Sequence, residues 1–465
     1  MKRILPFVLA AAMLLSGCTG KQLSDGAPLS VFPDGTQSTP GGASPSALAL
    51  SEPVYPEFPQ QPQWPEEGGE GVWDAYREAL ESYNDALSAI RGPGMTGAEQ
   101  DAVNAFAAKS LPLAIAGHEG ENAVYSPLSL WSALAMLAQC AGGNSRQQVL
   151  DALGADSVDN LQEAVSHVWQ ALYTDDGISS LILGNSIWLN GNLQGTYVKE
   201  TLDTLAQKHF AGTYSVPMGS EAADVAVTDW VNRQTNGLIG GDAPVVETQP
   251  ETLALLVSSL YYRTAWVDQF SASQTREDVF TNAAGHDSRV DFMHKTQYDT
   301  FLRLEGCQAA SLRTQLGEMV FVLPDEGVSP ESLLQETDFL ARLDFNGDAA
   351  RWGEIRWSIP KFDVNSNLDL IPALRALGIT DLPDPSKADL SALTDLGAFL
   401  SEAKQLARVK VDEEGVEAAA AMILSLPASG LQYEGVCVMD LDRPFLFVIR
   451  MEGIPLFIGI VNQVQ

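Results

Sequence analysis

The chain has 465 residues, and its 60 acidic against 27 basic side chains give a formal net charge of −33 at pH 7. Such a charge repels phosphate backbones and anionic lipid headgroups, which disfavours nucleic-acid binding and electrostatic attachment to a membrane. Only 4 cysteines occur, too few for the dense disulfide framework of a small secreted scaffold, so a hydrophobic core must stabilise the fold.

The N-terminus has the three parts of a secretory signal. Two basic residues precede an apolar run over residues 4–15, which is too short to cross a membrane. The run ends in Leu-Ser-Gly-Cys, which resembles a bacterial lipobox. We therefore predict a signal peptide over residues 1–17 and a lipid on the sulfur of Cys18 that anchors the protein at the membrane.

Residues 18–68 are predicted to form a disordered, lipid-anchored tether. The segment is rich in Pro, Gly, Ser and Gln, a composition that cannot bury a core. Nine of the 25 prolines fall within it: Pro28, Pro33, Pro40, Pro45, Pro53, Pro56, Pro59, Pro62 and Pro65.

An extra amphipathic helix and a linker are predicted within residues 69–97. Apolar side chains between Trp73 and Arg91 are spaced by three or four residues, which places them in one helical stripe. The stripe consists of Trp73, Tyr76, Leu80, Tyr83, Leu87 and Ile90. It packs either on the protein's own body, which we favour, or on a helix of a partner.

The main domain, residues 98–465, mixes helices and strands without regular βαβ alternation, which indicates an α+β fold. Ser126, followed by a proline, predicts the start of one helix. Two further helices are expected to end at Gly237 and Gly378. Strands are expected at residues 253–262, 319–323, 355–359, 445–449 and 456–461.

No motif of a hydrolase or a nucleotide-binding enzyme is present. The sequence lacks His-Glu-x-x-His, Gly-x-Ser-x-Gly and a phosphate-binding loop. Residues 401–404 match the Ser-x-x-Lys of penicillin-recognising enzymes, but neither Lys-Thr-Gly nor Ser-Asp-Asn accompanies them. We expect no metal site and no cofactor.

The most unusual stretch is residues 413–430, in which two glutamates and a glycine lead into four alanines and an apolar, turn-rich run. Four alanines suit a helix interior, because alanine is the best helix former. Small side chains also suit a segment that slides as a strand into a packed sheet. Composition by itself favours the helix and leaves the strand open.

Motifs elsewhere in the main domain change that preference. Residues 122–130 read NAVYSPLSL and match an Asn-x-x-x-Ser-Pro-x-Ser pattern. Further motifs follow in order: 230–237 (WVNRQTNG), 260–266 (LYYRTAW), 359–362 (IPKF), 377–379 (LGI), 412–421 (DEEGVEAAAA) and 443–449 (RPFLFVI). Over residues 98–462 this ordered set resembles the serpin family, of the bacterial lipoprotein type.

The resemblance implies an α+β serpin fold, with a large, mostly antiparallel central sheet, surrounding helices and an exposed reactive-centre loop. It also implies a protease inhibitor and not an enzyme. A serine protease cuts the loop, an acyl-enzyme forms, and the loop inserts into the central sheet before the protease can deacylate.

The hinge of that loop is matched by Glu413, Glu414, Gly415, Val416, Glu417, Ala418, Ala419, Ala420 and Ala421. Small alanines favour a true inhibitor, because bulky or charged hinge residues slow insertion. Val416 replaces the family's usual Thr or Ser with an uncharged, β-branched side chain of similar volume, which burial should tolerate.

Five residues match the region in which the family's sheet opens: Ser126, Ser129, Ser258, Trp266 and Gln405. Gln405 stands in place of a family histidine and Ser258 in place of an asparagine. Both can still form hydrogen bonds, so we expect a polar network with Ser126 and Ser129 to survive. Trp266 matches the tryptophan at the point where the loop first enters the sheet.

The cleaved bond depends on which end of the loop is used for counting. Family spacing from Gly415 gives Ser429-Gly430, and spacing back from Phe445 gives Tyr433-Glu434. The distance from the hinge matters more mechanically, because it sets how far the protease travels. The candidates in order of preference are Ser429, Gly430 and Ala428, and then Leu431 and Tyr433.

Small residues at the cleaved bond suit the shallow primary pocket of elastase-like or subtilisin-like serine proteases. Cleavage at Leu431 or Tyr433 would instead indicate proteases of the chymotrypsin type. No Arg or Lys occurs between Glu414 and Asp442, which disfavours trypsin-like targets.

Together these features predict an extracellular, monomeric serpin, held on the outer face of a bacterial membrane by the lipid on Cys18. It is expected to inhibit serine proteases irreversibly as a suicide substrate. The alternative is a non-inhibitory serpin that acts as a binding or structural protein, whose loop is cut but traps nothing.

Overall fold

The computed structural model describes residues 48–53, 55–63, 65, 69–177, 179–193, 195–239, 244–250, 252–416 and 433–464. The predicted signal peptide, Cys18 and most of the predicted tether lie outside these residues. No helix in the described ranges is long and apolar enough to cross a bilayer.

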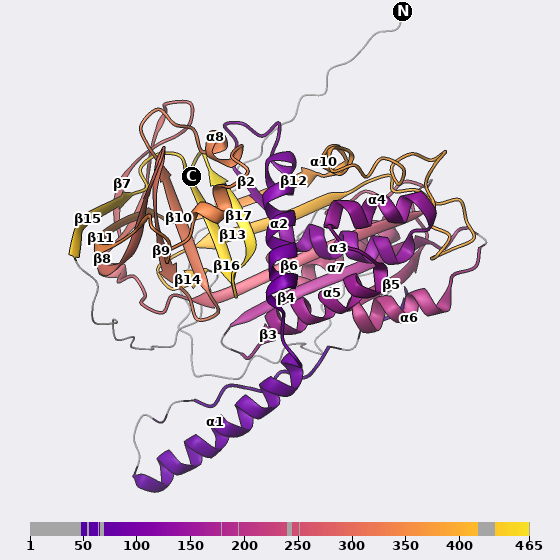
Figure 1. The fold of residues 1–465 in the computed structure, drawn as a ribbon, viewed down its shortest axis with the longest axis horizontal. Coiled ribbons are helices and arrows are strands. Elements are labelled where there is room, and N and C mark those ends of the chain that lie inside the picture. The colour runs from indigo at the N-terminus through magenta and orange to yellow at the C-terminus, as the bar shows by residue number, and fades with distance from the viewer. Residues whose placement is uncertain are drawn as a thin grey trace, which may run out of the picture.

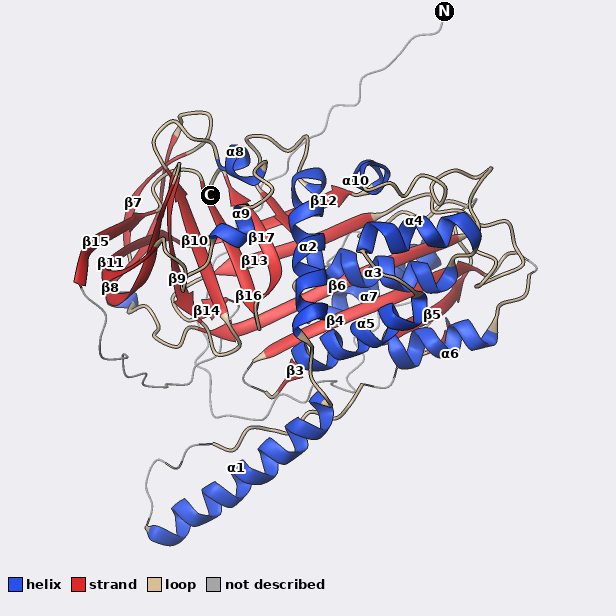
Figure 2. Cartoon of the chain, in the orientation of Figure 1, coloured by secondary structure: helices blue, strands red, loops and turns tan. Residues whose placement is uncertain are grey.

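One large sheet crosses the molecule (Figures 1 and 2). Its strands, in spatial order, are β1 (Ala49–Ser51), β5 (Ala211–Val216), β4 (Ser180–Asn190), β6 (Ala254–Ala265), β14 (Gly415–Val416), β13 (Lys404–Val411) and β12 (Phe362–Asp369). The short β3 (Thr174–Asp175) pairs with β4 beside this path. Every pair is antiparallel except β4 with β5, so the sheet is mostly antiparallel, as predicted.

A second sheet forms the other end of the molecule (Figure 1). Its strands are β15 (Tyr433–Asp440), β11 (Ala350–Pro360), β8 (Asp287–Leu304), β9 (Cys307–Arg313), β10 (Glu318–Pro324), β16 (Phe445–Met451), β17 (Ile454–Val461) and β2 (Ala123–Tyr125), with β7 (Arg276–Thr281) paired to β8. All five strands expected from the sequence are confirmed as β6, β10, β11, β16 and β17.

Helices cover both faces of the first sheet. Packed on its two faces or beside them are α2 (Gly97–Ala114), α3 (Pro127–Cys140), α4 (Gly143–Leu153), α5 (Val158–Leu172), α6 (Lys199–Lys208), α7 (Glu221–Gln234) and the short α10 (Ile371–Ala376). The short helices α8 (Pro330–Leu334) and α9 (Phe339–Arg342) lie beside the second sheet (Figure 2). Ser126 caps α3 by accepting a hydrogen bond from the Ser129 amide, as its sequence predicts. The α+β prediction is confirmed.

Two apolar clusters lie on opposite faces of the first sheet. The larger one joins α3, the inner face of β6 and the second sheet, and α3 itself is almost entirely buried. The smaller one lies under α7, where Trp188 stacks on Tyr214 and meets Trp230 edge to face. Alternate residues of β6 therefore face different clusters: Leu255 and Val257 face α7, whereas Leu256 and Ser258 face α3.

The structure corrects the prediction of a disordered tether for its last part. Residues 49–51 form β1, which pairs with the edge strand β5. Tyr55 then stacks on Trp169 and Tyr173, with ring centroids 5.5 and 5.8 Å away. Composition argued against a core, but a few apolar side chains among the prolines are enough to attach this segment to an existing core.

The predicted amphipathic helix is confirmed as α1 (Glu70–Arg91). It extends outward from the rest of the molecule (Figure 1). Gly92 at its C-terminal end has a φ of +57°, which a glycine adopts without strain, and the chain then turns into α2.

Candidate functional site

The site is a slot between two neighbouring strands of the first sheet. Strands β6 and β13 run in the same direction, because each is antiparallel to β14, which lies between them. However, β14 has only two residues: Val416 lies opposite Thr264 on β6 and Val411 on β13. Within the described residues no strand ladder joins β6 directly to β13 beyond this point, so the facing strand edges can accept another strand.

Hydrogen bonds around Trp266 fix the end of the slot that β14 occupies, which is called its upper end below. The indole N–H of Trp266 donates to the Asp412 carbonyl at 2.9 Å, and its backbone N–H donates to the Glu414 carbonyl at 3.0 Å. A Cβ at Gly415 would overlap the Thr264 carbonyl oxygen, so glycine is needed for the close approach of β14 to β6. Trp266 therefore lies where the chain begins to enter the sheet, as the resemblance predicts.

An ion pair joins the start of the hinge to Lys361, the residue between β11 and β12. The Lys361 ammonium lies 2.9 Å from the Glu413 carboxylate, which also accepts a hydrogen bond of 2.8 Å from the Thr275 hydroxyl. Burial by itself raises the pKa of Glu413, but hydrogen bonds from Lys361, the backbone and Thr275 outweigh it and hold the pKa below its usual value. The hydrogen bond to Glu413 raises the pKa of Lys361.

This ion pair predicts a pH-dependent contribution to stability. Because the folded-state pKa of Glu413 is lowered, its contribution is complete above the ordinary pKa of 4.5 and is lost as the pH falls through the folded-state value. We expect Glu413→Gln to destabilise the protein at pH 7 by about 0.5 kcal/mol, since Lys361 is partly exposed. Thermal unfolding at pH 7 and pH 3 tests this, and a difference that persists at pH 3 would contradict it.

Hydrogen bonds join the residues of the predicted polar network further along the slot, away from β14. The Gln405 side chain on β13 accepts from the Ser126 amide at 2.7 Å and donates to the Ser126 carbonyl at 2.8 Å. The Ser126 hydroxyl donates to Ser129 at 3.0 Å, and the Ser258 hydroxyl on β6 donates to the Ser129 carbonyl at 3.3 Å. Both edges of the slot are thereby held to the first turn of α3.

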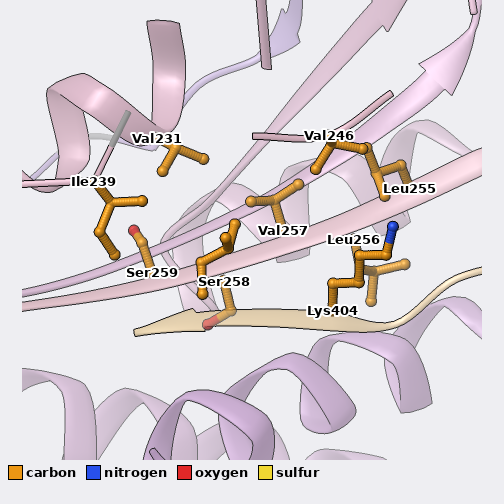
Figure 3. Close-up of a pocket in the computed structure, with 10 residues that line it drawn as sticks. Val231, Ile239, Val246, Leu255, Leu256, Val257, Ser258, Ser259 and Lys404 are labelled. Atoms are coloured by element: carbon orange, nitrogen blue, oxygen red, sulfur yellow. The ribbon is translucent and has the colours of Figure 1, made fainter. Parts of the chain in front are cut away.

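Small cavities lie on both faces of the slot. On the α3 side, a cavity of about 40 Å³ is lined by Leu134, Leu256 and Gln405, among other residues. On the α7 side, a cavity of about 10 Å³ lies between Val231 on the helix and Lys404 on β13 (Figure 3). The larger unfilled space therefore lies on the α3 side of the slot.

The connection after α7 covers the outer face of the slot. Arg408 on β13 donates to the Leu238 carbonyl of this connection at 2.8 Å, while Asp363 on β12 accepts two further hydrogen bonds from the same guanidinium at 2.8 and 2.6 Å. The connection is thus tied to β13 although α7 packs on β6. Any strand that entered the slot would pass beneath it.

Five predicted residues therefore come together around one slot: Ser126, Ser129, Ser258 and Gln405 form the network, and Trp266 forms the upper end. Hinge residues 413–416 are placed at that end, and Tyr433 begins β15 with half of its side chain exposed. The remaining candidates lie outside the described residues: Glu417, Ala418, Ala419, Ala420, Ala421, Ala428, Ser429, Gly430 and Leu431.

Three residues that contribute to the site were not predicted from the sequence: Lys361, Thr275 and Arg408. Alternating apolar and polar residues over 407–411 indicate the strand that carries Arg408. No local pattern could have paired Lys361 with Glu413, because the two residues are 52 positions apart in the sequence.

Comparisons with known proteins agree with this geometry. A family model described as "Serpin (serine protease inhibitor)" matches residues 101–464. The chain is 32% identical to Serpin-Z1C of Triticum aestivum over 366 residues, which cover 73% of this chain and 90% of that protein. It is 28% identical to Serpin B9 of Homo sapiens over 365 residues, or 75% of this chain and 94% of that protein.

Solved structures give the same result for the fold. The native state of tengpin, a thermophilic serpin, superposes with a TM-score of 0.70 and 25% identity, covering 80% of this chain and 96% of that one. AtSerpin1 of Arabidopsis in its native stressed conformation gives a TM-score of 0.68 over 80% of this chain and 99% of that one. The α+β fold with its large central sheet is therefore the serpin fold, and the chain belongs to the serpin family, a family of serine protease inhibitors.

Proposed function

We propose that this serpin traps serine proteases irreversibly by inserting its loop, from Glu417 up to the cleaved bond, into the slot between β6 and β13. The observation that carries the proposal is the slot itself. One end is already occupied by β14, and both strand edges continue beyond it. With cleavage after Ser429, the 13 residues from Glu417 to Ser429 supply a strand long enough to fill it.

The register of β14 defines how such a strand would sit. Continued antiparallel from Val416, it brings Glu417 opposite Arg263 and Lys410, and Ala418 opposite Tyr262 and Val409. Side chains at alternate positions face opposite sides. Even-numbered loop residues would then face the buried interior, as Val416 does, and the Glu417 carboxylate would lie on the outer face between two cations.

The same register brings Met422 between Ser258 and Gln405, beside the cavity on the α3 side. A flexible methionine fills irregular spaces well, and alanines at positions 418 and 420 enter without steric obstruction. The buried side of the proposed strand is therefore apolar over its first several positions.

In this mechanism the protease serine attacks a loop carbonyl and forms an acyl-enzyme. Strand insertion then carries the attached protease along the sheet before water can reach the ester. Distortion of the protease's oxyanion hole removes the stabilisation that deacylation needs. Loop insertion of this kind is an established case of strand addition driven by released strain.

We place the cleaved bond at Ser429-Gly430 or Ala428-Ser429, which suits elastase-like or subtilisin-like targets with shallow primary pockets. We further propose that the mature protein is an extracellular lipoprotein anchored through Cys18. The lipobox-like sequence supports the anchor, and the net charge argues against purely electrostatic attachment.

The direct test mixes purified protein lacking residues 1–47 with an elastase, subtilisin, chymotrypsin and trypsin. We expect a covalent band that survives boiling with the elastase and with subtilisin. Mass spectrometry of the released C-terminal fragment identifies its first residue and hence the cleaved bond. If every protease cuts the loop and none forms the band, the protein is a non-inhibitory serpin.

A further inference from the structure

The segment before α1 shows a regular pattern of prolines and exposure. Prolines stand at every third position: Pro53, Pro56, Pro59, Pro62 and Pro65. The exposed side chains also recur every three residues, at Glu57, Gln60 and Gln63, while the intervening described residues are partly buried. A polyproline II helix has three residues per turn, so this periodicity places the prolines on one covered side of such a helix.

Both ends of the unit made by this segment and α1 lie at the last turn of α5. Tyr55 stacks on Trp169, and Phe58 meets Tyr173 edge to face at 6.0 Å. At the other end, a Cβ on Gly92 would lie 3.2 Å from the Gln170 side-chain oxygen. The chain therefore leaves α5 at Tyr55 and returns to it at Gly92.

The lengths of the two arms match. As a polyproline II helix, the eleven residues from Tyr55 to Pro65 would span about 34 Å at 3.1 Å per residue. The 22 residues of α1 span about 33 Å at 1.5 Å per residue. Only four residues separate Pro65 from Glu70, so two arms of equal length that start and end at one place must run antiparallel, side by side.

The apolar stripe of α1 is covered over its whole length. Trp73, Tyr76, Leu80, Tyr83 and Leu87 are all partly buried, although the helix extends away from the domain (Figure 1). A helix that projects into solvent would leave such a stripe exposed unless another segment covered it. The proline segment has the same length as α1, and its covered side chains recur at regular intervals. It is therefore the segment that can cover the stripe.

The middle of this unit, near Gln60 and Tyr83, also touches the turn between β3 and β4. A Cβ on Gly177 would overlap the Gln60 side-chain amide. Burial raises the pKa of Tyr83, and the nearby Asp176 carboxylate raises it further, which places α1 beside the same turn.

That turn reaches the upper end of the slot. The Asp176 carboxylate accepts a hydrogen bond of 2.7 Å from the Ser179 amide, and the Ser179 hydroxyl lies 3.3 Å from the Thr264 hydroxyl. Thr264 is the β6 residue directly opposite Val416.

We propose that residues 55–91 form a proline–helix hairpin, in which the polyproline segment covers the apolar stripe of α1. We also propose that the middle of this hairpin, near Gln60 and Tyr83, holds the β3–β4 turn against β6 where the loop enters the sheet. The hairpin itself follows from the lengths and periodicities above. The bracing rests on the proposed function, because it concerns the strand that flanks the inserting loop. Loss of the hairpin would loosen β6 at this point and allow the intact loop to insert without cleavage.

Trypsin offers a specific probe of the hairpin, because Arg77 and Arg91 are the only basic residues between Lys21 and Lys109. Arg77 is exposed on α1 and pairs with Asp74, so cleavage after it requires local opening of the helix. We expect the double variant Pro59→Gly with Pro62→Gly to be cut after Arg77 about tenfold faster than the wild type. The matched control Glu57→Gly with Gln63→Gly changes exposed positions of the same segment and should behave as the wild type.

Equal cleavage of the proline variant and its control would overturn the hairpin, because the changes lie more than ten residues from Arg77 and act only through packing.

The bracing is tested by the half-life of inhibitory activity during incubation at a raised temperature. The proline variant should lose activity roughly fivefold faster than its control. A fivefold change in rate corresponds to the net free energy of about one hydrogen bond. An unchanged half-life would overturn the bracing. If the wild type forms no covalent complex, the proposed function fails, and Arg77 cleavage still decides the hairpin.

Discussion

Exchanging two hinge residues, in the double variant Glu417→Ala with Ala418→Glu, is expected to convert the protein from an inhibitor into a substrate. The exchange preserves composition and net charge and moves one carboxylate by one position. In the register of β14, position 417 faces outward between Arg263 and Lys410, whereas position 418 faces inward beside Tyr262 and Val409. Both inward neighbours are buried.

Burying a carboxylate without a partner costs at least about 3 kcal/mol. Such a cost would slow insertion roughly a hundredfold and give the acyl-enzyme time to hydrolyse. The single variant Glu417→Ala is the matched control and should still trap protease. Denaturing gels of each variant with subtilisin measure the trapped fraction, and equal trapping by the double variant and the control would contradict the register.

Cleavage of the loop is expected to raise the thermal midpoint of unfolding by at least about 10 °C. The inserted strand would pair with the free edges of β6 and β13, and roughly ten added backbone hydrogen bonds contribute about 5 kcal/mol at 0.5 kcal/mol each. For a protein of this size 1 kcal/mol raises the midpoint by about 2 °C.

Differential scanning calorimetry of the intact and the cleaved protein measures this change. The double variant at positions 417 and 418, cleaved in the same way, is the control, because its loop is cut but its insertion is hindered. A cleaved wild-type protein that melts no higher than the intact one would show that the slot stays empty.

Much of the fold could be predicted from local patterns. Ser126 with its following proline predicts the start of α3, and the spacing of Trp73, Tyr76 and Leu80 predicts α1, because caps and periodicity act over a few residues. The five predicted strands are apolar and largely buried. The long strand β8 was missed because many of its side chains are polar and its pattern is set by its neighbours in the sheet.

The resemblance predicts a polar network, and Gln405 forms hydrogen bonds there because its side chain can both donate and accept, as the family histidine can. The ion pair of Lys361 with Glu413 could not be predicted, since only the folded chain brings these residues together. The proline segment was interpreted as a disordered tether from its composition. The signal that corrects this interpretation is present in the sequence, in the spacing of Pro56, Pro59 and Pro62, but composition ignores spacing.

Hydrogen exchange at the edges of the slot shows directly whether the cleaved loop inserts between β6 and β13. The amides of peptides from β6 and β13 would be compared in the intact protein and in its covalent complex with a protease, with β10 and β16 as internal controls. Insertion should make β6 and β13 strongly protected along their whole length in the complex, while the control strands are unchanged. A complex in which β6 and β13 exchange as fast as in the intact protein would contradict insertion between these strands.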